Sequence, residues 1–340
     1  MISAAQLVMF GYDRPTLDAD FRSLVERQPL AGVLLHGDAL GPPDQVRALT
    51  SEIQRSAAGA AGTSAPPPTL LIAVDQEGGR AQAWGPPHQE PIPAAAEIGW
   101  EYEASGERLE ITLLGMEVGR RLQAAGINLN FAPVLDVHTR PGNPIIGDRS
   151  YGPRPELVAE AGGAFIEGLQ AAGVLACGKH FPGHGDTEVD SHLALPAVSH
   201  GEERLRTVEL VPFAMAISRG LEMVMTAHVL YPAWDAERPA TVSPAIVDGV
   251  LRRELGFSGV VVTDALEMQG LRQRHDLVEA ALLALGAGCD LLLSVEEPER
   301  RQELLDGLDR ALGDGRLSRE RLEESLRRVA TLKLDWLAAA

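Results

Sequence analysis

Short apolar runs recur along this 340-residue chain and predict the strands of an α/β protein. Most of the runs are apolar at consecutive positions instead of alternating ones, which is typical of parallel strands covered by helices on both faces. Seven such runs stand out, at Ala31–His36, Thr69–Gln76, Ile127–Pro133, Leu175–Phe181, Met223–Val229, Gly259–Ala265 and Leu291–Val295. The pattern therefore indicates a largely parallel sheet.

Segments with helical spacing separate these runs. Helix start and stop signals are clearest around Ser243, which we expect to cap a helix that begins at Pro244 and ends at Gly256. Strand and helix alternate repeatedly, which is typical of an open doubly wound sheet or of a closed barrel. We expect helices over Pro42–Ala58, Gly106–Ala125, Pro155–Ala172, Glu202–Arg219, Pro244–Leu255, Leu277–Leu285 and Pro298–Leu312, and a closing helix over Leu317–Leu337.

Polar residues at the strand ends favour the barrel. A barrel gathers catalytic groups from many strand ends, whereas an open sheet binds ligands at one switch point. No glycine-rich dinucleotide or P-loop fingerprint follows any run. We predict one catalytic (β/α)8 barrel domain over residues 1–340, with allowance for one irregular or missing strand, and Leu7–Gly11 as the candidate eighth strand. The polar residues at the strand ends are Asp75, Asp136, His180, His228 and Asp264.

Composition and charge exclude several classes of partner. The net charge of −18 and the pI near 4.9 argue against nucleic acid, because binding phosphates requires clustered Lys and Arg. The amino terminus meets Asp13 before any long apolar run, so we expect no signal peptide, no membrane span and a cytoplasmic protein. Cys177 and Cys289 are isolated, which predicts buried free thiols. We expect a monomer.

Ionisable side chains are most concentrated in residues 179–192, which read KHFPGHGDTEVDSH and hold seven of them in fourteen positions. Asp190 precedes His192 by two residues, a spacing at which a carboxylate can orient an imidazole as a proton shuttle. In the alternative interpretation, Asp190 only caps a turn and His192 faces water. A second alternative is a metal site, with ligands drawn from His184, Asp186, Asp190 and His192.

Two carboxylates follow apolar runs elsewhere in the chain. Asp264 lies in GVVVTDALEM and is either a nucleophile or base on a rigid strand end, or the cap of the following turn. Asp75 has the same placement in LLIAVDQEGGR, where Gly78 and Gly79 leave space for a ligand. Burial of either carboxylate is costly unless it is paired or lies at the mouth of the barrel.

Five motifs in order resemble glycoside hydrolase family 3: DQEGGR, NPIIGDRSY, KHFPGHGDTEVDSH, PATVS and TDALEM. The DSH triplet resembles the β-N-acetylhexosaminidase branch of that family. The resemblance implies a (β/α)8 barrel and a retaining double displacement, with Asp264 as nucleophile and His192, tuned by Asp190, as general acid and base. It also implies that the sugar hydroxyls and N-acetyl group are held by Asp75, Arg149, Lys179 and His180.

The resemblance implies an enzyme without metal or cofactor that removes terminal β-linked N-acetylglucosamine from cell-wall or chitin-derived oligosaccharides. A histidine acid departs from the usual pair of carboxylates, although its ordinary pKa suits proton transfer near neutrality. Ala83 occupies a position where peptidoglycan-recycling relatives often have Arg, which weakens the expectation of a muropeptide substrate. The alternatives are a phosphorylase, a glycosidase for another sugar, a metal-dependent barrel hydrolase and a sugar-binding protein.

Overall fold

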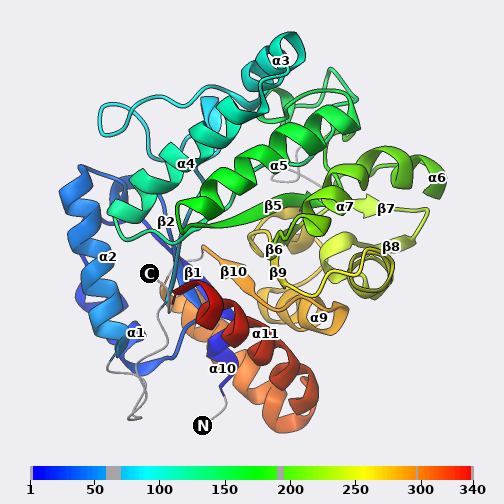
Figure 1. The fold of residues 1–340 in the computed structure, drawn as a ribbon. Helices are drawn as coiled ribbons and strands as arrows, with labels where there is room; N and C mark the ends of the chain where they lie inside the picture. The colour runs from blue at the N-terminus through cyan, green and yellow to red at the C-terminus, as the bar shows by residue number, and fades with distance from the viewer. Residues whose placement is uncertain (1–2, 59–69, 190–194, 296–297, 338–340) are drawn as a thin grey trace.

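The computed structural model describes residues 3–58, 70–189, 195–295 and 298–337, and their centre is a sheet of eight parallel strands (Figure 1). Neighbouring strands are hydrogen-bonded in the order β10-β1-β2-β3-β4-β5-β6-β9. All seven predicted runs contain a strand. The bounds are β1 Val8–Tyr12, β2 Gly32–Leu35, β3 Leu71–Val74, β4 Leu129–Asn130, β5 Leu175–Phe181, β6 Met223–Thr226, β9 Val260–Thr263 and β10 Leu292–Ser294.

The sheet curls into a barrel that is almost closed between β9 and β10. Val262 forms a single parallel bridge with Leu291 across this seam. The Thr263 N–H donates to the Leu291 carbonyl at 3.0 Å, and the Leu291 N–H donates to the Val261 carbonyl at 2.9 Å. The predicted (β/α)8 barrel is therefore confirmed. Its eighth strand is β1, where Leu7–Gly11 was the candidate, and its shortest strand is β4.

Helices surround the barrel and cover the outer face of the strands (Figure 1). Helices α4 (Arg108–Ala124) and α5 (Pro155–Ala171) can pack closely because Gly115 has no side chain. A Cβ at this position would lie 2.6 Å from the Phe165 carbonyl oxygen. Among the described residues, none of the helices combines the length and the apolar character needed to cross a bilayer. The bounds are α1 Ala19–Arg27, α2 Pro43–Ala58, α3 Ala95–Ser105, α4 Arg108–Ala124, α5 Pro155–Ala171, α6 Glu202–Arg204, α7 Val211–Ser218, α8 Gln269–Arg272, α9 Leu277–Ala287, α10 Pro298–Asp314 and α11 Arg319–Leu337.

The region after β6 differs from the prediction in two ways. The Ser243 hydroxyl donates to Asp235 Oδ2 at 2.7 Å and caps no helix. The following helix, η7 (Ala245–Glu254), is of π type and is succeeded, as predicted, by Gly256 with a positive φ of 70°. A short antiparallel hairpin of β7 (Leu230–Tyr231) and β8 (Asp235–Pro239) supplies the competing carboxylate. The cap was predicted wrongly because the partner of Ser243 belongs to this hairpin.

A buried carboxylate joins the last helix to the barrel. Asp290 is fully buried just before β10, and its Oδ1 accepts from Arg321 at 3.0 Å and Arg328 at 3.1 Å, both on α11. Arg252 from η7 contacts Oδ2, and the Ser325 hydroxyl donates to Oδ1 at 2.8 Å. These donors compensate the buried charge of Asp290. Without it, Arg252 would lose this carboxylate partner, and Arg321 and Arg328 would keep only Glu324 as a counter-ion.

Replacement of Asp290 therefore tests how strongly α11 is held. We expect Asp290→Asn to lower the free energy of unfolding by about 3 kcal/mol, because three guanidinium groups lose their common counter-ion. Urea denaturation measures the change. Arg327→Ala, at an exposed position of α11, is the control and should alter stability by less than about 0.5 kcal/mol. Equal stability of Asp290→Asn and the native protein would contradict the assignment.

Candidate active site

A cavity of about 300 Å³ opens at the carboxyl ends of the barrel strands. Asp75 follows β3, Lys179 and His180 lie in the last part of β5, and Asp264 follows β9. Because parallel strands in a closed sheet end on the same face, these side chains converge although the sequence separates them widely. The polar lining consists of Asp75, Glu77, Arg80, Gln82, Arg149, Lys179, His180, His184 and Asp264.

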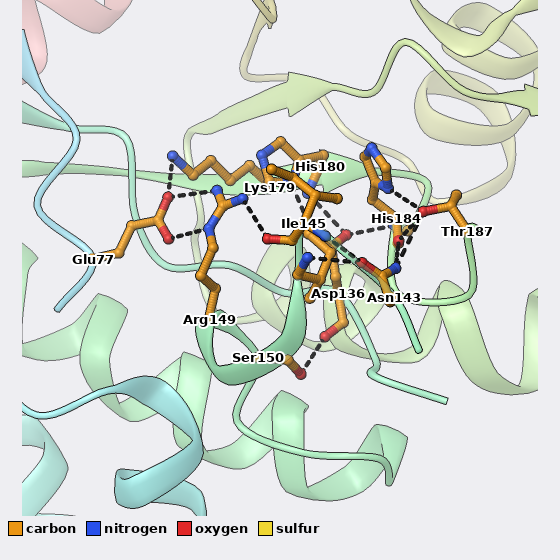
Figure 2. Close-up of polar contacts among 12 residues, drawn as sticks. Glu77, Asp136, Asn143, Ile145, Arg149, Ser150, Lys179, His180, His184 and Thr187 are labelled. Carbon is orange, nitrogen blue, oxygen red and sulfur yellow. Dashed lines mark hydrogen bonds and ion pairs between the residues drawn. The ribbon is translucent and has the colours of Figure 1, made fainter. Parts of the chain in front are cut away.

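One side of the cavity is an ion network around Glu77 (Figure 2). Lys179 Nζ lies 2.6 Å from Glu77 Oε1 and 2.6 Å from Asp75 Oδ1. Arg149 holds Glu77 through two bonds of 2.8 Å, from Nε to Oε2 and from Nη2 to Oε1. The side chains of Lys179 and Glu77 are 3% and 5% exposed, so each charge depends on the other for compensation.

The network shifts the pKa values of its members in opposite directions. Burial raises the pKa of Glu77, but Lys179 and Arg149 outweigh burial and bring the pKa to about 2. Burial lowers the pKa of Lys179, and the Asp75 and Glu77 carboxylates more than reverse this and raise it. Both residues are therefore charged near neutrality, and Lys179 is a cation and hydrogen-bond donor, not a base.

The opposite side is organised by Asp136, a fully buried carboxylate after β4. Its Oδ1 accepts from the backbone N–H of His180 at 3.1 Å and of His184 at 2.7 Å, and its Oδ2 lies 2.7 Å from His180 Nδ1. Burial raises the pKa of Asp136, but the charge and hydrogen bond of His180, together with the backbone hydrogen bond from His184, lower it below its ordinary value. An ionised carboxylate only accepts, so His180 Nδ1 carries a proton and the ring orientation is set.

His184 is held by neighbours in the loop after β5. Its Nδ1 lies 2.8 Å from Thr187 Oγ1, and Asn143 Nδ2 donates to the His184 carbonyl at 2.9 Å (Figure 2). Burial lowers the pKa of His184 to about 4, assisted by the charge of His180, so the ring is neutral near pH 7. Gly185 follows at a point where a Cβ would come within 1.9 Å of the Val137 carbonyl oxygen. Only glycine permits this approach.

Asn143 also shapes the loop that supplies Arg149. Its Oδ1 accepts from the backbone N–H groups of Ile145 and Ile146, at 2.9 and 2.8 Å. The Ile145 carbonyl in turn accepts from Arg149 Nη1 at 3.2 Å and from Arg80 Nη2 at 2.8 Å. The NPIIGDRSY motif therefore forms a turn that fixes the guanidinium against Glu77.

Asp264 lines the same cavity as members of both networks. Its Oδ1 accepts from the Ala265 backbone N–H at 2.8 Å. Burial raises the pKa of Asp264, but the positive charges of His180 and His228, that N–H group and the charge of Lys179 together lower it below its ordinary value. The carboxylate is thus ionised, a state in which it can act as a nucleophile or base.

Two residues of the alternative metal site, His184 and Asp186, have protein partners, while Asp190 and His192 lie outside the described residues. Asp186 Oδ1 accepts from Arg140 Nε at 2.9 Å, and Asp186 Oδ2 contacts His200. His184 contacts Thr187. Asp186, His200 and Glu209 do bring possible ligand atoms within 4.8 Å of one another. Two guanidinium groups compete for these carboxylates, since Arg140 pairs with Asp186 and Arg204 lies 3.2 Å from Glu209.

The structure brings together five of the seven residues predicted for the site. Asp264 and the four candidate sugar ligands, Asp75, Arg149, Lys179 and His180, line one cavity. Asp190 and His192 lie outside the described residues. The functional roles of all seven stay predictions.

Sequence reasoning assigned no role to Glu77 and Asp136. Glu77 was inside the DQEGGR motif, two residues beyond Asp75, and Asp136 had been noted at a strand end. The signal available in the sequence was that each is an acidic residue in a segment that the predicted fold places at the mouth of the barrel. Their partners lie on other strands and loops, which composition and spacing do not reveal.

Comparison with known proteins connects this site to one family. The sequence profile of the glycosyl hydrolase family 3 N terminal domain matches residues 3–332. Beta-hexosaminidase A of Pseudoalteromonas piscicida is 37% identical over 94% of this chain, and a beta-hexosaminidase of Methylococcus capsulatus is 38% identical over 88%. The solved glycoside hydrolase family 3 beta-N-acetylglucosaminidase from Paenibacillus is 43% identical over 99% of this chain, with a TM-score of 0.93.

These relatives differ in length. The matched region is 55% of the Pseudoalteromonas protein and 62% of the Paenibacillus chain, so this chain spans little more than half the length of those two. It is 86% of the Methylococcus protein. The beta-N-acetylhexosaminidase of Beutenbergia cavernae, with a TM-score of 0.87 and 30% identity, is covered over 96% of its chain.

The low pKa of Glu77 predicts a defined loss of stability in acid. Because its folded pKa of about 2 lies below the ordinary 4.5, its charge stabilises the fold above pH 4.5, and this contribution disappears as pH falls towards 2. Glu77→Gln should therefore unfold more easily than the native protein at pH 7, and the gap in melting temperature should narrow between pH 4.5 and pH 2. The exposed Glu90→Gln variant is the control. A pH-independent gap would rule out the predicted linkage.

Proposed function

Because this chain belongs to glycoside hydrolase family 3, we propose that it is a retaining exo-β-N-acetylglucosaminidase. The observation that carries the proposal is the ionised Asp264 carboxylate, which faces the same cavity as the paired Lys179, Arg149 and Asp75. A nucleophile beside a cluster of directional donors and acceptors is suited to a polyol substrate. The names of the relatives, beta-hexosaminidase and beta-N-acetylglucosaminidase, support the choice of sugar.

The proposed reaction has two displacements. Asp264 attacks the anomeric carbon while His192 gives a proton to the departing glycosidic oxygen, so the aglycone leaves as a neutral alcohol. The bond formed is a glycosyl ester of Asp264. His192, now neutral, takes a proton from water, and the resulting hydroxide attacks the same carbon and restores the Asp264 carboxylate. Two inversions give a sugar with the starting β configuration.

The ion network would recognise the terminal sugar. Lys179 and Arg149 can donate to hydroxyl or carbonyl oxygens, and Asp75, whose side chain is 40% exposed, can accept from a hydroxyl. His180 binds Asp136 through Nδ1, so Nε2 is the ring nitrogen left to contact the sugar. This combination provides both donors and acceptors, as the hydroxyl and acetamido groups of N-acetylglucosamine require.

Cell-wall fragments and chitin-derived oligosaccharides are the proposed substrates. Phosphorolysis is the alternative reaction, because a histidine acid places no second carboxylate beside the anomeric carbon to repel phosphate. The product separates the two: hydrolysis releases free N-acetylglucosamine in phosphate buffer, and phosphorolysis releases its 1-phosphate.

Removal of the proposed nucleophile should abolish turnover. We expect Asp264→Ala to lower kcat on an aryl N-acetylglucosaminide by at least about 10⁴-fold, because no covalent intermediate can form. Release of the aryl group, followed by absorbance, measures the rate. Asp248→Ala, at a half-exposed position on η7 outside the cavity lining, should keep native activity. Activity of Asp264→Ala close to that of the native enzyme would disprove the role of Asp264.

Removal of the proposed acid should depend on the leaving group. For His192→Ala we expect about 10²- to 10⁴-fold lower kcat/KM with poor aryl leaving groups and a smaller loss with activated ones, which need little protonation. A series of aryl N-acetylglucosaminides with graded phenol pKa measures the difference. His275, a half-buried histidine that pairs with Glu279 and lies outside the cavity lining, offers a control in His275→Ala. Equal losses across the series would contradict an acid role for His192.

A further inference from the structure

Two buried residues near the proposed nucleophile neither contact the reacting atoms nor bind sugar in the proposed reaction. Thr241 belongs to the PATVS motif and lies on the short helix η6 (Ala240–Val242). His228 follows β6 by two positions. They are 0% and 1% exposed, and they come from a part of the chain that supplies none of the proposed catalytic or sugar-binding groups.

The two residues form the end of a hydrogen-bonded chain that reaches the nucleophile turn. The Thr226 hydroxyl lies 3.0 Å from the Thr241 hydroxyl, which in turn lies 2.7 Å from His228 Nδ1. His228 Nε2 lies 2.9 Å from the carbonyl oxygen of Ala265. The Thr241 hydroxyl also reaches the Ala227 carbonyl at 3.0 Å, so the chain is tied to the backbone at both ends.

Proton counting defines the direction of the last bond. The Ala265 carbonyl oxygen can only accept, so His228 Nε2 carries a proton and donates it. The Thr241 hydroxyl can donate to or accept from Nδ1, and either direction fixes the plane of the ring. Both ring nitrogens of His228 are thereby engaged, and the ring cannot turn without breaking two buried hydrogen bonds.

The backbone of Ala265 connects the fixed ring of His228 to Asp264. Its carbonyl accepts from His228, and its N–H donates to Asp264 Oδ1 at 2.8 Å. The hydrogen bond from His228 thus holds the Ala265 carbonyl in place, and the Ala265 N–H in turn holds Asp264. A nucleophilic carboxylate must meet the anomeric carbon in one orientation, and a displacement of about 1 Å can cost about 10²-fold in rate.

We propose that Thr241 and His228 are positioning residues that orient the Asp264 carboxylate for attack through Ala265. The inference rests on the proposed function, in which Asp264 is the nucleophile. In this proposal, the PATVS motif holds the turn that carries the nucleophile, and it does so from the end of the neighbouring strand. The proposed role predicts an effect on the attack itself and little effect on binding of the sugar.

The test isolates formation of the glycosyl-aspartate. A 5-fluoro-N-acetylglucosaminyl fluoride labels the nucleophile covalently, and its fluoride leaves with little help from an acid. We expect Thr241→Val to lower the labelling rate and kcat by about 10- to 100-fold, with KM changed by less than about threefold. Thr241→Ser keeps the hydroxyl and should restore most of the rate. Peptide mapping by mass spectrometry identifies the labelled residue.

Thr50→Val is the matched control, because the buried Thr50 hydroxyl on α2 donates to the Ala125 carbonyl at 2.7 Å and lies outside the cavity lining. Its labelling rate should equal that of the native enzyme. Native labelling rates in Thr241→Val, or equal slowing in Thr241→Val and Thr50→Val, would overturn the inference and leave the proposed function standing. If Thr241→Val does not fold, His228→Gln tests the same chain, and native-rate labelling there overturns it.

Failure of the proposed function gives a different result. The native enzyme would then carry no label on Asp264, and both the nucleophile assignment and the inference would be wrong. Labelling of Asp264 in the native enzyme, slow labelling in Thr241→Val and recovery in Thr241→Ser together support the inference.

Discussion

Compensation of buried charge at the mouth of the barrel is the constraint on which the site depends. Strands β3 and β5 flank β4 in the parallel sheet, so their carboxyl ends lie near each other and bring together Glu77 and Lys179, both of which are buried. Neither charge is tolerable alone, and Arg149 completes the set from the loop that Asn143 shapes. The side chains that would bind sugar are therefore held in place before any ligand arrives.

The ionised form of Asp264 depends on residues of both networks. The charges of His180 and Lys179 favour that form, while the Ala265 N–H holds one of the carboxylate oxygens. Asp136 keeps His180 oriented without entering the cavity lining itself. The site thus contains an inner set of groups that face the cavity and an outer set whose charges and hydrogen bonds determine how the inner set is oriented.

The sequence predicts the barrel well because its signals are local. Each strand carries its own apolar run, and Gly256 ends η7 through its own positive φ. Prediction fails where the conformation of a residue depends on a partner that is distant in the sequence. Ser243 bonds to Asp235 in an unpredicted hairpin instead of capping a helix, and Glu77 pairs with Arg149 at a separation of 72 positions. The cavity brings the candidate sugar ligands and Asp264 together, whereas Asp190 and His192 fall outside the described residues.

A double displacement at Asp264 leaves the first product with the configuration of the substrate, so the stereochemistry of that product distinguishes it from a single displacement. Proton NMR of an aryl β-N-acetylglucosaminide mixed with the native enzyme records the anomeric signal before mutarotation. We expect the β-anomer of N-acetylglucosamine to appear first and the α-anomer to grow in later. Initial appearance of the α-anomer would show a single inverting displacement and would contradict a covalent intermediate on Asp264.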